Sequence, residues 1–338
     1  MKSVFFETSD KDRAMLGGLI KNIPNLEFVF TDKKLSIENI SEAKDADIIS
    51  IFINSEIKKD VIEQLPSLKF IATRSTGYDH VDISYATEKG IRVANVPSYG
   101  THTVAEFTFA LILSLSRKIY PAYNQLREGS DFNISNLEGF DLYGKTLGII
   151  GMGKIGKNVI RMAKGFGMNI LAYDIAPDEK FASETCTKCT SLEEVLAGSD
   201  IISIHTLFNK STYHLINKNN IGKIKKGAYL INTARGEIVE TEALLNAIKG
   251  GDLAGAGLDV LEAERQLKEE SQLINNRDEK IKDFKVLYED HILIDLPQVI
   301  VTPHIAFFTK EAEEEILKIT ICNIRAFVEG RNENLIQV

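Results

Sequence analysis

The sequence has 338 residues, of which 44% are hydrophobic and 26% charged, and its formal net charge is −8. This length exceeds one ordinary hydrophobic core, so we expect two domains. The negative charge, with no run of Lys or Arg to offset it, argues against nucleic acid or an anionic membrane as a partner. The N-terminus lacks the apolar core of a signal peptide, and the most apolar stretch, 104–115, is shorter than the roughly 20 residues of a membrane-spanning helix. Because the cysteines number only three, an odd count, we expect a protein of the reducing cytoplasm.

Short apolar runs alternate with helix-length polar stretches over the first hundred residues. This alternation predicts a parallel sheet covered by helices on both faces. The predicted strands are 4–6, 28–30, 48–53, 70–72 and 91–93.

Turn-forming residues at 95–100 end this series. Thr103 and Glu106 then have the spacing of a capping box and open a predicted helix over 103–117. Because this helix is apolar on almost every face, it must be buried on several sides. We expect it to pack between the domains and against a second subunit, in a homodimer.

A second series of strands and helices begins near residue 145 and predicts a second doubly wound parallel sheet. From residue 302 onward there is one long helical pattern and no new strand, so we expect the chain to return to its first domain. The predicted domains are 1–100 together with 302–338, and 101–301. The charged stretch 265–285, part of a longer insertion over 265–295, has the character of a solvated loop. The predicted strands are 147–150, 170–173, 201–204, 228–231, 256–258 and 299–301.

A glycine-rich turn follows the strand at 147–150 and precedes a helical stretch at 157–166, which is the context of a dinucleotide-binding motif. Its first glycine permits the tight turn, the second lets the backbone approach a pyrophosphate, and the third allows close helix–strand packing. Asp174 lies 18 residues beyond, where a carboxylate binds ribose hydroxyls and repels a 2′-phosphate, so NAD is favoured over NADP. The loop residues expected to bind NAD are Gly151, Gly153, Lys154, Ile155 and Gly156.

Cys186 and Cys189 have the Cys-x-x-Cys spacing of some zinc and redox sites. No second cysteine pair and no His at ligand spacing accompany them, and the segment looks like a polar loop. We therefore expect two incidental thiols and no metal site.

Arg235, Glu264 and His304 each follow an apolar strand-like run. In parallel sheets such positions face the ligand crevice, although an isolated Arg or Glu is usually a surface residue. The planar fork of an Arg suits a carboxylate, and a Glu beside a His favours the charged imidazole. A cofactor site combined with an acid–base site predicts hydride transfer.

Several motifs in this order make the sequence resemble the D-isomer-specific 2-hydroxyacid dehydrogenases, over essentially all 338 residues and closest to the D-lactate dehydrogenase branch. The resemblance implies a Rossmann NAD-binding domain inserted into a flavodoxin-like substrate domain. The motifs are 73–82, 104–106, the glycine-rich turn, Tyr173-Asp174, 232–236, 257–264 and 302–306.

By this resemblance, Arg235 binds the carboxylate of a 2-oxo acid and polarises its carbonyl. His304 is the general acid in reduction and the base in oxidation, and Glu264 hydrogen-bonds His304. Asp259 lies near the nicotinamide carboxamide. The positions expected to line the cofactor are His205, Thr206, Thr233 and Ala234, and the backbone expected to hold the other carboxylate oxygens is that of Ser75, Thr76 and Gly77. The remaining histidines, His80, His102, His214 and His291, are expected at surfaces.

Phe52, Tyr99 and Phe307 match aromatic positions that enclose the substrate side chain, although aromatic residues are also common in cores. An apolar pocket favours pyruvate or a larger apolar 2-oxo acid. Glyoxylate, hydroxypyruvate, 2-oxoisocaproate and phenylpyruvate are alternative substrates, and a non-enzymatic NAD-sensing scaffold is an alternative function. The sequence departs from the family pattern at Leu207 and Arg265, each in place of a Pro, and in the forty positions from Glu264 to His304.

Overall fold

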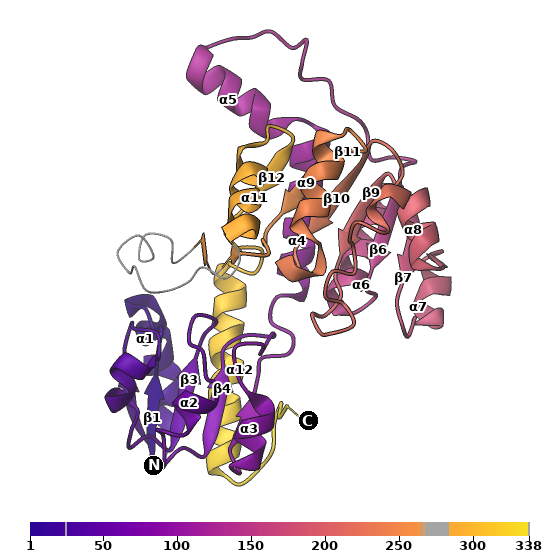
Figure 1. Ribbon diagram of the computed structural model, residues 1–338. Coiled ribbons are helices and arrows are strands. Elements are labelled where there is room, and N and C mark those ends of the chain that lie inside the picture. The colour runs from indigo at the N-terminus through magenta and orange to yellow at the C-terminus, as the bar shows by residue number, and fades with distance from the viewer. Residues whose placement is uncertain (24–25, 265, 268–283, 337–338) are drawn as a thin grey trace. The chain divides into compact units, whose positions relative to one another are not determined.

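The computed structural model describes residues 1–23, 26–264, 266–267 and 284–336. The chain divides into two compact units, of which unit 1 contains Met1–Tyr99 and Phe308–Val338 and unit 2 contains Gly100–Phe307 (Figure 1). Residues 302–307 therefore belong with unit 2, and not with the first domain as the sequence had suggested. The physical reason is that the backbone N–H groups of His304, Ile305 and Ala306 donate hydrogen bonds to Asp259 of unit 2.

Unit 1 contains a five-stranded parallel sheet in the order β2-β1-β3-β4-β5, which is the flavodoxin-like order. Helices α1 (Asp10–Leu19) and α12 (Lys310–Val328) cover one face, and α2 (Lys59–Ile62) and α3 (Ile83–Glu88) cover the other. The strands are β1 (Lys2–Phe5), β2 (Glu27–Phe30), β3 (Ile48–Ile51), β4 (Phe70–Thr73) and β5 (Arg92–Ala94).

The C-terminal helix α12 completes the core of unit 1. Its Phe327 ring stacks on Phe70 of β4 with ring centroids 4.5 Å apart, and Leu317 and Ile324 are buried in the same cluster. The chain then reaches β5, where Ile336 N donates to Val93 O at 2.9 Å. Residues near both ends of the sequence therefore build one unit.

Unit 2 contains a seven-stranded parallel sheet in the order β12-β11-β10-β9-β6-β7-β8. The direction of winding reverses between β6 and β9, as in Rossmann folds. One strand, β8 (Lys188–Cys189), falls where the sequence suggested only a loop; it pairs with β7 over two residues, too short for an apolar pattern. The others are β6 (Thr146–Ile150), β7 (Asn169–Tyr173), β9 (Ile201–Ile204), β10 (Ala228–Asn232), β11 (Leu253–Leu258) and β12 (Val299–Val301).

Helices cover both faces of this sheet. On one face lie α4 (Thr101–Ser116), α6 (Lys154–Gly165) and α7 (Glu179–Glu184), and on the other lie α8 (Leu192–Gly198), α9 (Thr241–Lys249) and α11 (Phe284–Asp295). Among the described residues, no helix combines the length and the apolar character needed to cross a bilayer.

The apolar helix α4 is buried largely by its own unit. It packs against α6, β10 and β11, and Phe109 stacks on Phe166 with ring centroids 5.0 Å apart. The expected capping box at Thr103 is wrong, because the helix already begins at Thr101 with Gly100 as its N-cap. The first hydrogen bond of the helix joins Val104 N to Gly100 O at 2.9 Å, so the helix starts before Thr103.

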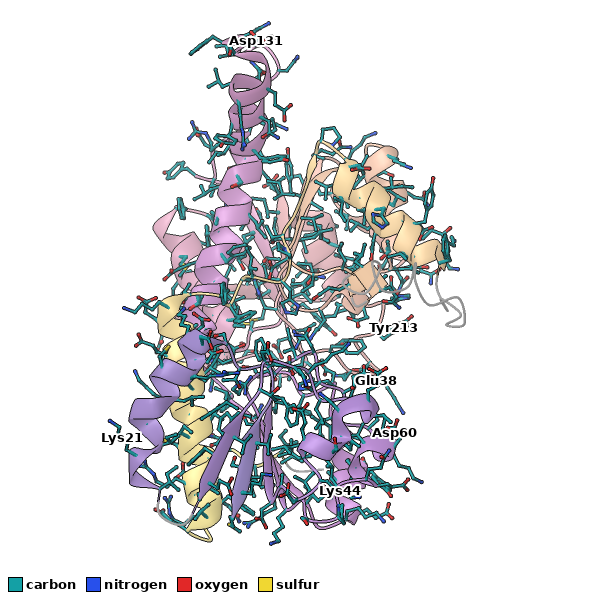
Figure 2. All side chains as sticks on the ribbon, turned by 90° about the vertical axis from the view of Figure 1, so that its left-hand side faces the viewer. Lys21, Glu38, Lys44, Asp60, Asp131 and Tyr213 are labelled. Carbon is teal, nitrogen blue, oxygen red and sulfur yellow. The ribbon has the colours of Figure 1, made fainter. Side chains whose placement is uncertain are left out.

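Two helices of unit 2 were not expected from the sequence. Helix α5 (Ile119–Gly129) follows α4, contains no buried residue and extends away from the sheet, with Asp131 beside its far end (Figures 1 and 2). Helix α11 follows the charged stretch 265–285, overlaps it only at Phe284 and Lys285, and has buried residues that include Leu287, Asp290 and Leu293. Arg265 and 268–283 lie outside the described residues.

Candidate active site

Arg235 follows the carboxyl end of β10 in a turn that Asn232 fixes. Asn232, only 1% exposed, accepts from Ala234 N at 3.0 Å and donates to Arg235 O at 2.8 Å. One guanidinium nitrogen, Nη1, donates to Ala234 O at 2.8 Å. The sequence pattern did not single out Asn232, although a buried amide after a strand is a turn-forming residue.

Gly236, next along the chain, lies against the segment that leads to Glu264. A Cβ on Gly236 would lie 2.1 Å from the carbonyl carbon of Leu261 and 2.4 Å from the amide nitrogen of Glu262. Only glycine permits two backbones to approach this closely. The turn that carries Arg235 and the segment that carries Glu264 are therefore fixed against each other.

His304 and Glu264 form an ion pair. His304 Nδ1 lies 2.9 Å from Glu264 Oε1 and 3.1 Å from Oε2, and the two side chains are 20% and 24% exposed. This contact places a hydrogen on Nδ1 and makes Nε2 the ring nitrogen that can exchange a proton with a ligand. His304 also has a left-handed backbone, with φ 55°, which is uncommon for a residue other than glycine.

Asp259, the residue after β11, holds the loop that contains His304. Its Oδ1 accepts from Thr302 Oγ1 at 2.6 Å and from Ile305 N at 3.0 Å, and its Oδ2 accepts from Ala306 N at 2.8 Å. Its carbonyl accepts from His304 N at 2.9 Å. Burial raises the pKa of Asp259. Both carboxylate oxygens are thus bonded to the His304 loop, whereas the resemblance had implied only a position near the nicotinamide.

The glycine-rich turn has the geometry of a dinucleotide cradle. Gly151 has φ +100°, and a Cβ there would lie 2.7 Å from the backbone of His205 and Thr206 after β9. A Cβ on Gly156 would overlap Gly151 O, whereas one on Gly153 would meet nothing within 4 Å. Open space at Gly153, directly before the N-terminus of α6, is the position where a pyrophosphate fits.

Asp174, directly after β7, is bonded to this turn. Its Oδ2 accepts from Met152 N at 2.6 Å and its Oδ1 accepts from Ala176 N at 2.9 Å. The carboxylate therefore lies at the edge of the cradle, where it suits a ribose. The residues present fit NAD.

His205 and Thr233 lie at neighbouring strand ends. The surface of His205 is partly exposed, but its ring is closely surrounded by protein atoms. Desolvation lowers the pKa of His205 to about 3, so the ring is neutral near pH 7. Its Nε2 lies 2.8 Å from Ser203 Oγ. Thr233 Oγ1 is 3.1 Å from Thr108 Oγ1 of α4. The candidate cofactor residues thus gather at the carboxyl ends of β6, β7, β9 and β10.

In unit 1, the loop Ser75-Thr76-Gly77 follows β4. The Ser75 hydroxyl donates to Gly77 O at 2.6 Å and the Thr76 hydroxyl donates to Val96 O at 2.7 Å, so both side-chain donors are engaged within the unit. This leaves backbone N–H groups as the donors suited to an anion.

Phe52 follows the neighbouring strand β3, where its backbone N donates to Glu7 Oε1 at 3.1 Å. Arg74, almost fully buried, donates from Nη2 to both Phe6 O and Glu7 O at 2.7 Å. Glu7 and Arg74 were not expected from the sequence. Tyr99 ends the first segment of unit 1, and Phe307 ends unit 2, where its ring meets that of His304 edge-on at 6.3 Å.

The expectation that the remaining histidines lie at surfaces is correct only for His102. His80 lies 3.2 Å from Thr73 Oγ1, and His291 is half-buried. His214, which is half-buried and has a left-handed backbone, lies with Nε2 2.6 Å from Glu262 Oε1.

Cys186 and Cys189 are free thiols, and Cys189 lies 3.6 Å from Met152 Sδ. In the part of the chain that the structure describes, no three potential ligands gather into a metal site.

The geometry agrees with what the chain is similar to. Residues 109–306 match the family model of the D-isomer specific 2-hydroxyacid dehydrogenase, NAD binding domain. The 2-hydroxyacid dehydrogenase A of Aspergillus oryzae is 38% identical, covering 97% of this chain and 92% of that protein. The D-lactate dehydrogenase kk1H of Curvularia clavata is 36% identical, covering 99% and 97%.

Among solved structures, D-lactate dehydrogenase from Aquifex aeolicus, complexed with NAD and lactic acid, has a TM-score of 0.86 at 35% identity, covering 97% of this chain and 96% of that one. Family model, full-length relatives and structure agree on one assignment. The chain belongs to the D-isomer-specific 2-hydroxyacid dehydrogenases and is an NAD-dependent oxidoreductase.

Proposed function

We propose that this enzyme interconverts pyruvate and D-lactate. The observation that carries the proposal is the His304–Glu264 ion pair, which follows the ends of β12 and β11. The neighbouring strand β10 leads into the turn that contains Arg235. An anion-binding fork and a proton-exchanging imidazole on adjacent strand ends are what reduction of a 2-oxo acid requires.

The proposed mechanism assigns one role to each of these side chains. Arg235 binds the substrate carboxylate and orients the carbonyl group. His304 Nε2 donates a proton to the carbonyl oxygen during reduction and removes it from the hydroxyl during oxidation. Glu264 stabilises the charged imidazole through Nδ1. The glycine-rich turn at Gly151, Gly153 and Gly156 would hold NAD, which would supply or accept the hydride when bound.

The substrate preference rests on apolar side chains. Phe307 lies beside His304, and Phe52 and Tyr99 are the aromatic residues expected from unit 1. Aromatic residues without a lysine or arginine among them favour a small apolar 2-oxo acid over a phosphorylated one. The D-lactate dehydrogenases of Curvularia clavata and Aquifex aeolicus support the same choice. Phenylpyruvate, 2-oxoisocaproate, hydroxypyruvate and glyoxylate are the competing substrates.

The test is NADH oxidation, followed by absorbance, with the purified protein and a panel of 2-oxo acids. We expect the highest kcat/KM with pyruvate and formation of the D isomer of lactate. Arg235→Lys keeps the positive charge but loses the fork, so kcat/KM for pyruvate should fall by about 100-fold. A higher kcat/KM with phenylpyruvate or glyoxylate would reject pyruvate as substrate, and wild-type kinetics in Arg235→Lys would remove this residue from the site.

We also propose a homodimer formed through the region of the apolar helix. Because α4 is largely buried within unit 2, the surface available to a second subunit is that of α5, where Ile119, Tyr120 and Tyr123 are each more than half exposed. Sedimentation should show a dimer for the wild type and a smaller species for Tyr123→Glu. A monomeric wild type would reject this proposal.

A further inference from the structure

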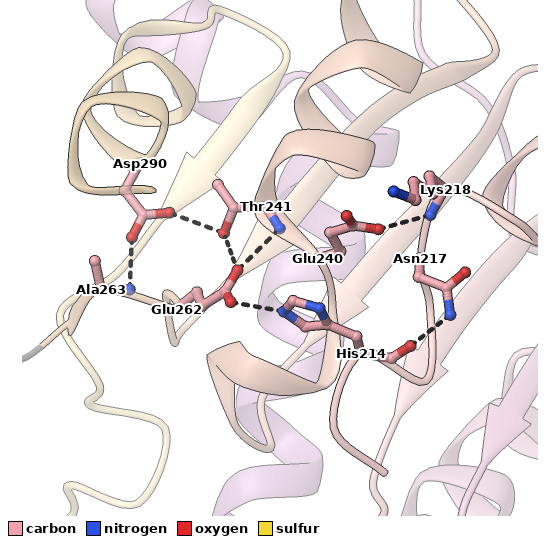
Figure 3. Close-up of polar contacts among 8 residues, drawn as sticks. All are labelled: His214, Asn217, Lys218, Glu240, Thr241, Glu262, Ala263 and Asp290. Atoms are coloured by element: carbon pink, nitrogen blue, oxygen red, sulfur yellow. Dashed lines mark hydrogen bonds and ion pairs between the residues drawn. The ribbon is translucent and has the colours of Figure 1, made fainter. Parts of the chain in front are cut away.

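Asp290 is a carboxyl group completely buried inside unit 2, beside the segment that carries Glu264. It lies on α11 and is 0% exposed. Its Oδ2 accepts a hydrogen bond from Ala263 N at 2.9 Å, and its Oδ1 lies 3.4 Å from the hydroxyl of Thr241 (Figure 3). Since Ala263 directly precedes Glu264, Asp290 holds the backbone from which the Glu264 side chain reaches His304.

The hydrogens available in this cluster indicate which carboxyl group carries a proton. Thr241 has one hydroxyl hydrogen. Glu262 Oε2 accepts from that hydroxyl at 2.9 Å and from Thr241 N at 3.1 Å, as Figure 3 shows. With the Thr241 hydrogen directed at Glu262, the contact with Asp290 is a hydrogen bond only when Asp290 donates its own acid proton to Thr241 Oγ1.

The charges around Asp290 favour the same arrangement. Glu262 lies at the N-terminus of α9, and its Oε1 lies 2.6 Å from His214 Nε2. On α11, Glu289 adds a second negative charge. Lys285 of α11 lies 2.6 Å from Glu242 of α9 and 3.7 Å from Glu289. Burial, together with the charges of Glu262 and Glu289, raises the pKa of Asp290 to about 7.

We propose that Asp290 is a positioning residue for the His304–Glu264 pair and acts in its protonated form, accepting from Ala263 with one oxygen and donating to Thr241 with the other. This inference rests on the acid–base role proposed above for that pair. On ionisation, Asp290 loses its donor and becomes a second buried anion beside Glu262. Ala263 N still donates to the ionised carboxylate, but the repulsion between Asp290 and Glu262 displaces the segment that leads to Glu264, and proton delivery from His304 slows as the pH rises.

Asp290→Asn tests this idea because the amide is neutral at every pH and retains both contacts. Its carbonyl can accept from Ala263 N, and its NH₂ group can donate to Thr241. We expect this variant to keep kcat within about threefold of wild type at pH 6.5. It should lose the part of the alkaline decline in kcat that is centred near pH 7 and keep the decline that follows loss of the His304 proton. Asp290→Ala should lower kcat about tenfold or more with little change in the KM for NADH. Asp295→Asn, which neutralises an exposed carboxylate of the same helix, is the matched control and should keep the wild-type pH profile.

Three results would overturn the inference: a loss of kcat in Asp290→Asn as large as in Asp290→Ala, a wild-type pH profile in Asp290→Asn, or a wild-type kcat in Asp290→Ala. Thermal melting of each variant separates lost folding from lost positioning. If Asp290→Ala does not fold, Asp290→Asn alone decides the question. His304→Ala is measured in parallel, because substantial turnover in that variant would reject the proposed acid–base mechanism whatever the Asp290 variants do.

Discussion

Gly236→Ala should separate the two halves of the candidate site by adding one methyl group. The new Cβ would lie 2.1 Å from the Leu261 carbonyl carbon, so reaching an ordinary separation of about 3.5 Å requires a shift of about 1.4 Å. The atoms in the way belong to backbone and cannot rotate aside. The turn that carries Arg235 must therefore move relative to the segment that leads to Glu264.

A displacement of roughly 1 Å between groups that act together costs on the order of 100-fold in rate, or about 2.7 kcal/mol of transition-state stabilisation. We expect Gly236→Ala to lower kcat/KM for pyruvate by about this factor. NADH binding, followed by its fluorescence, should change much less, because Gly151, Gly153 and Gly156 are untouched. The melting temperature should fall, since overpacking costs about 1–3 kcal/mol.

Gly165→Ala is the matched control. A Cβ on this glycine of α6 meets nothing within 4 Å, and alanine is the better helix former, so activity should stay at the wild-type level. Wild-type kcat/KM in Gly236→Ala would refute the reasoning, because the two backbones would then be free to move apart without consequence. A loss of equal size in Gly165→Ala would show that the assay reports general damage.

Four further predictions concern three carboxyl groups, those of Asp174, Glu264 and Asp290, and the imidazole of His304. Asp174→Ala should weaken NADH binding about tenfold and reduce the ratio of NADH affinity to NADPH affinity, measured by titrating the protein with each cofactor. Equal use of NADH and NADPH by the wild type would contradict the role of Asp174. His304→Ala should lower kcat for pyruvate by about 10²–10⁴-fold while NADH still binds. Glu264→Gln should move the alkaline limit of pyruvate reduction to lower pH, because an uncharged amide no longer stabilises the imidazolium of His304. An unchanged pH profile in Glu264→Gln would reject the proposed role of Glu264 beside His304. Folding raises the pKa of Asp290 from 3.8 to about 7, so the stabilising contribution of this group is complete below pH 3.8 and is lost as the pH rises toward 7. Relative to Asp290→Asn, the free energy of unfolding of the wild type should fall by about 4 kcal/mol over this range, measured by urea unfolding at several pH values. Parallel curves of unfolding free energy against pH for the two proteins would contradict the assignment.

Much of this fold could be predicted because its strands are short apolar runs separated by polar stretches. The runs around Ile149 and Ile202 are buried on both faces of the sheet, and only a parallel sheet covered by helices buries them in that way. Arg235, Glu264 and His304 could be proposed because each follows such a run. The carboxyl ends of parallel strands lie at the same edge of a sheet, so the position of each residue after its strand was enough to predict that the three lie close together.

What escaped prediction depends on contacts between distant residues. The sequence gives no sign that Glu289 and Asp290 are buried, because their partners, Lys285 and the Ala263 amide, are identified only by the structure. Helix α5 was missed although Pro121 lies in its first turn, where proline is tolerated and where it marks the break after Lys118, whose backbone is left-handed. The close approach at Gly236 likewise depends on Leu261, 25 residues away.

The stacking of Phe70 on Phe327 has a consequence for how this chain is made. The two residues are 257 positions apart, so at 5–20 residues per second strand β4 emerges from the ribosome roughly 10–50 s before the helix that covers it. Unit 2 is continuous in sequence, and all of its strands are synthesised before α12 is complete. The later-synthesised Rossmann unit can therefore acquire its native structure first, while the exposed face of the N-terminal sheet is a natural target for chaperones until α12 arrives.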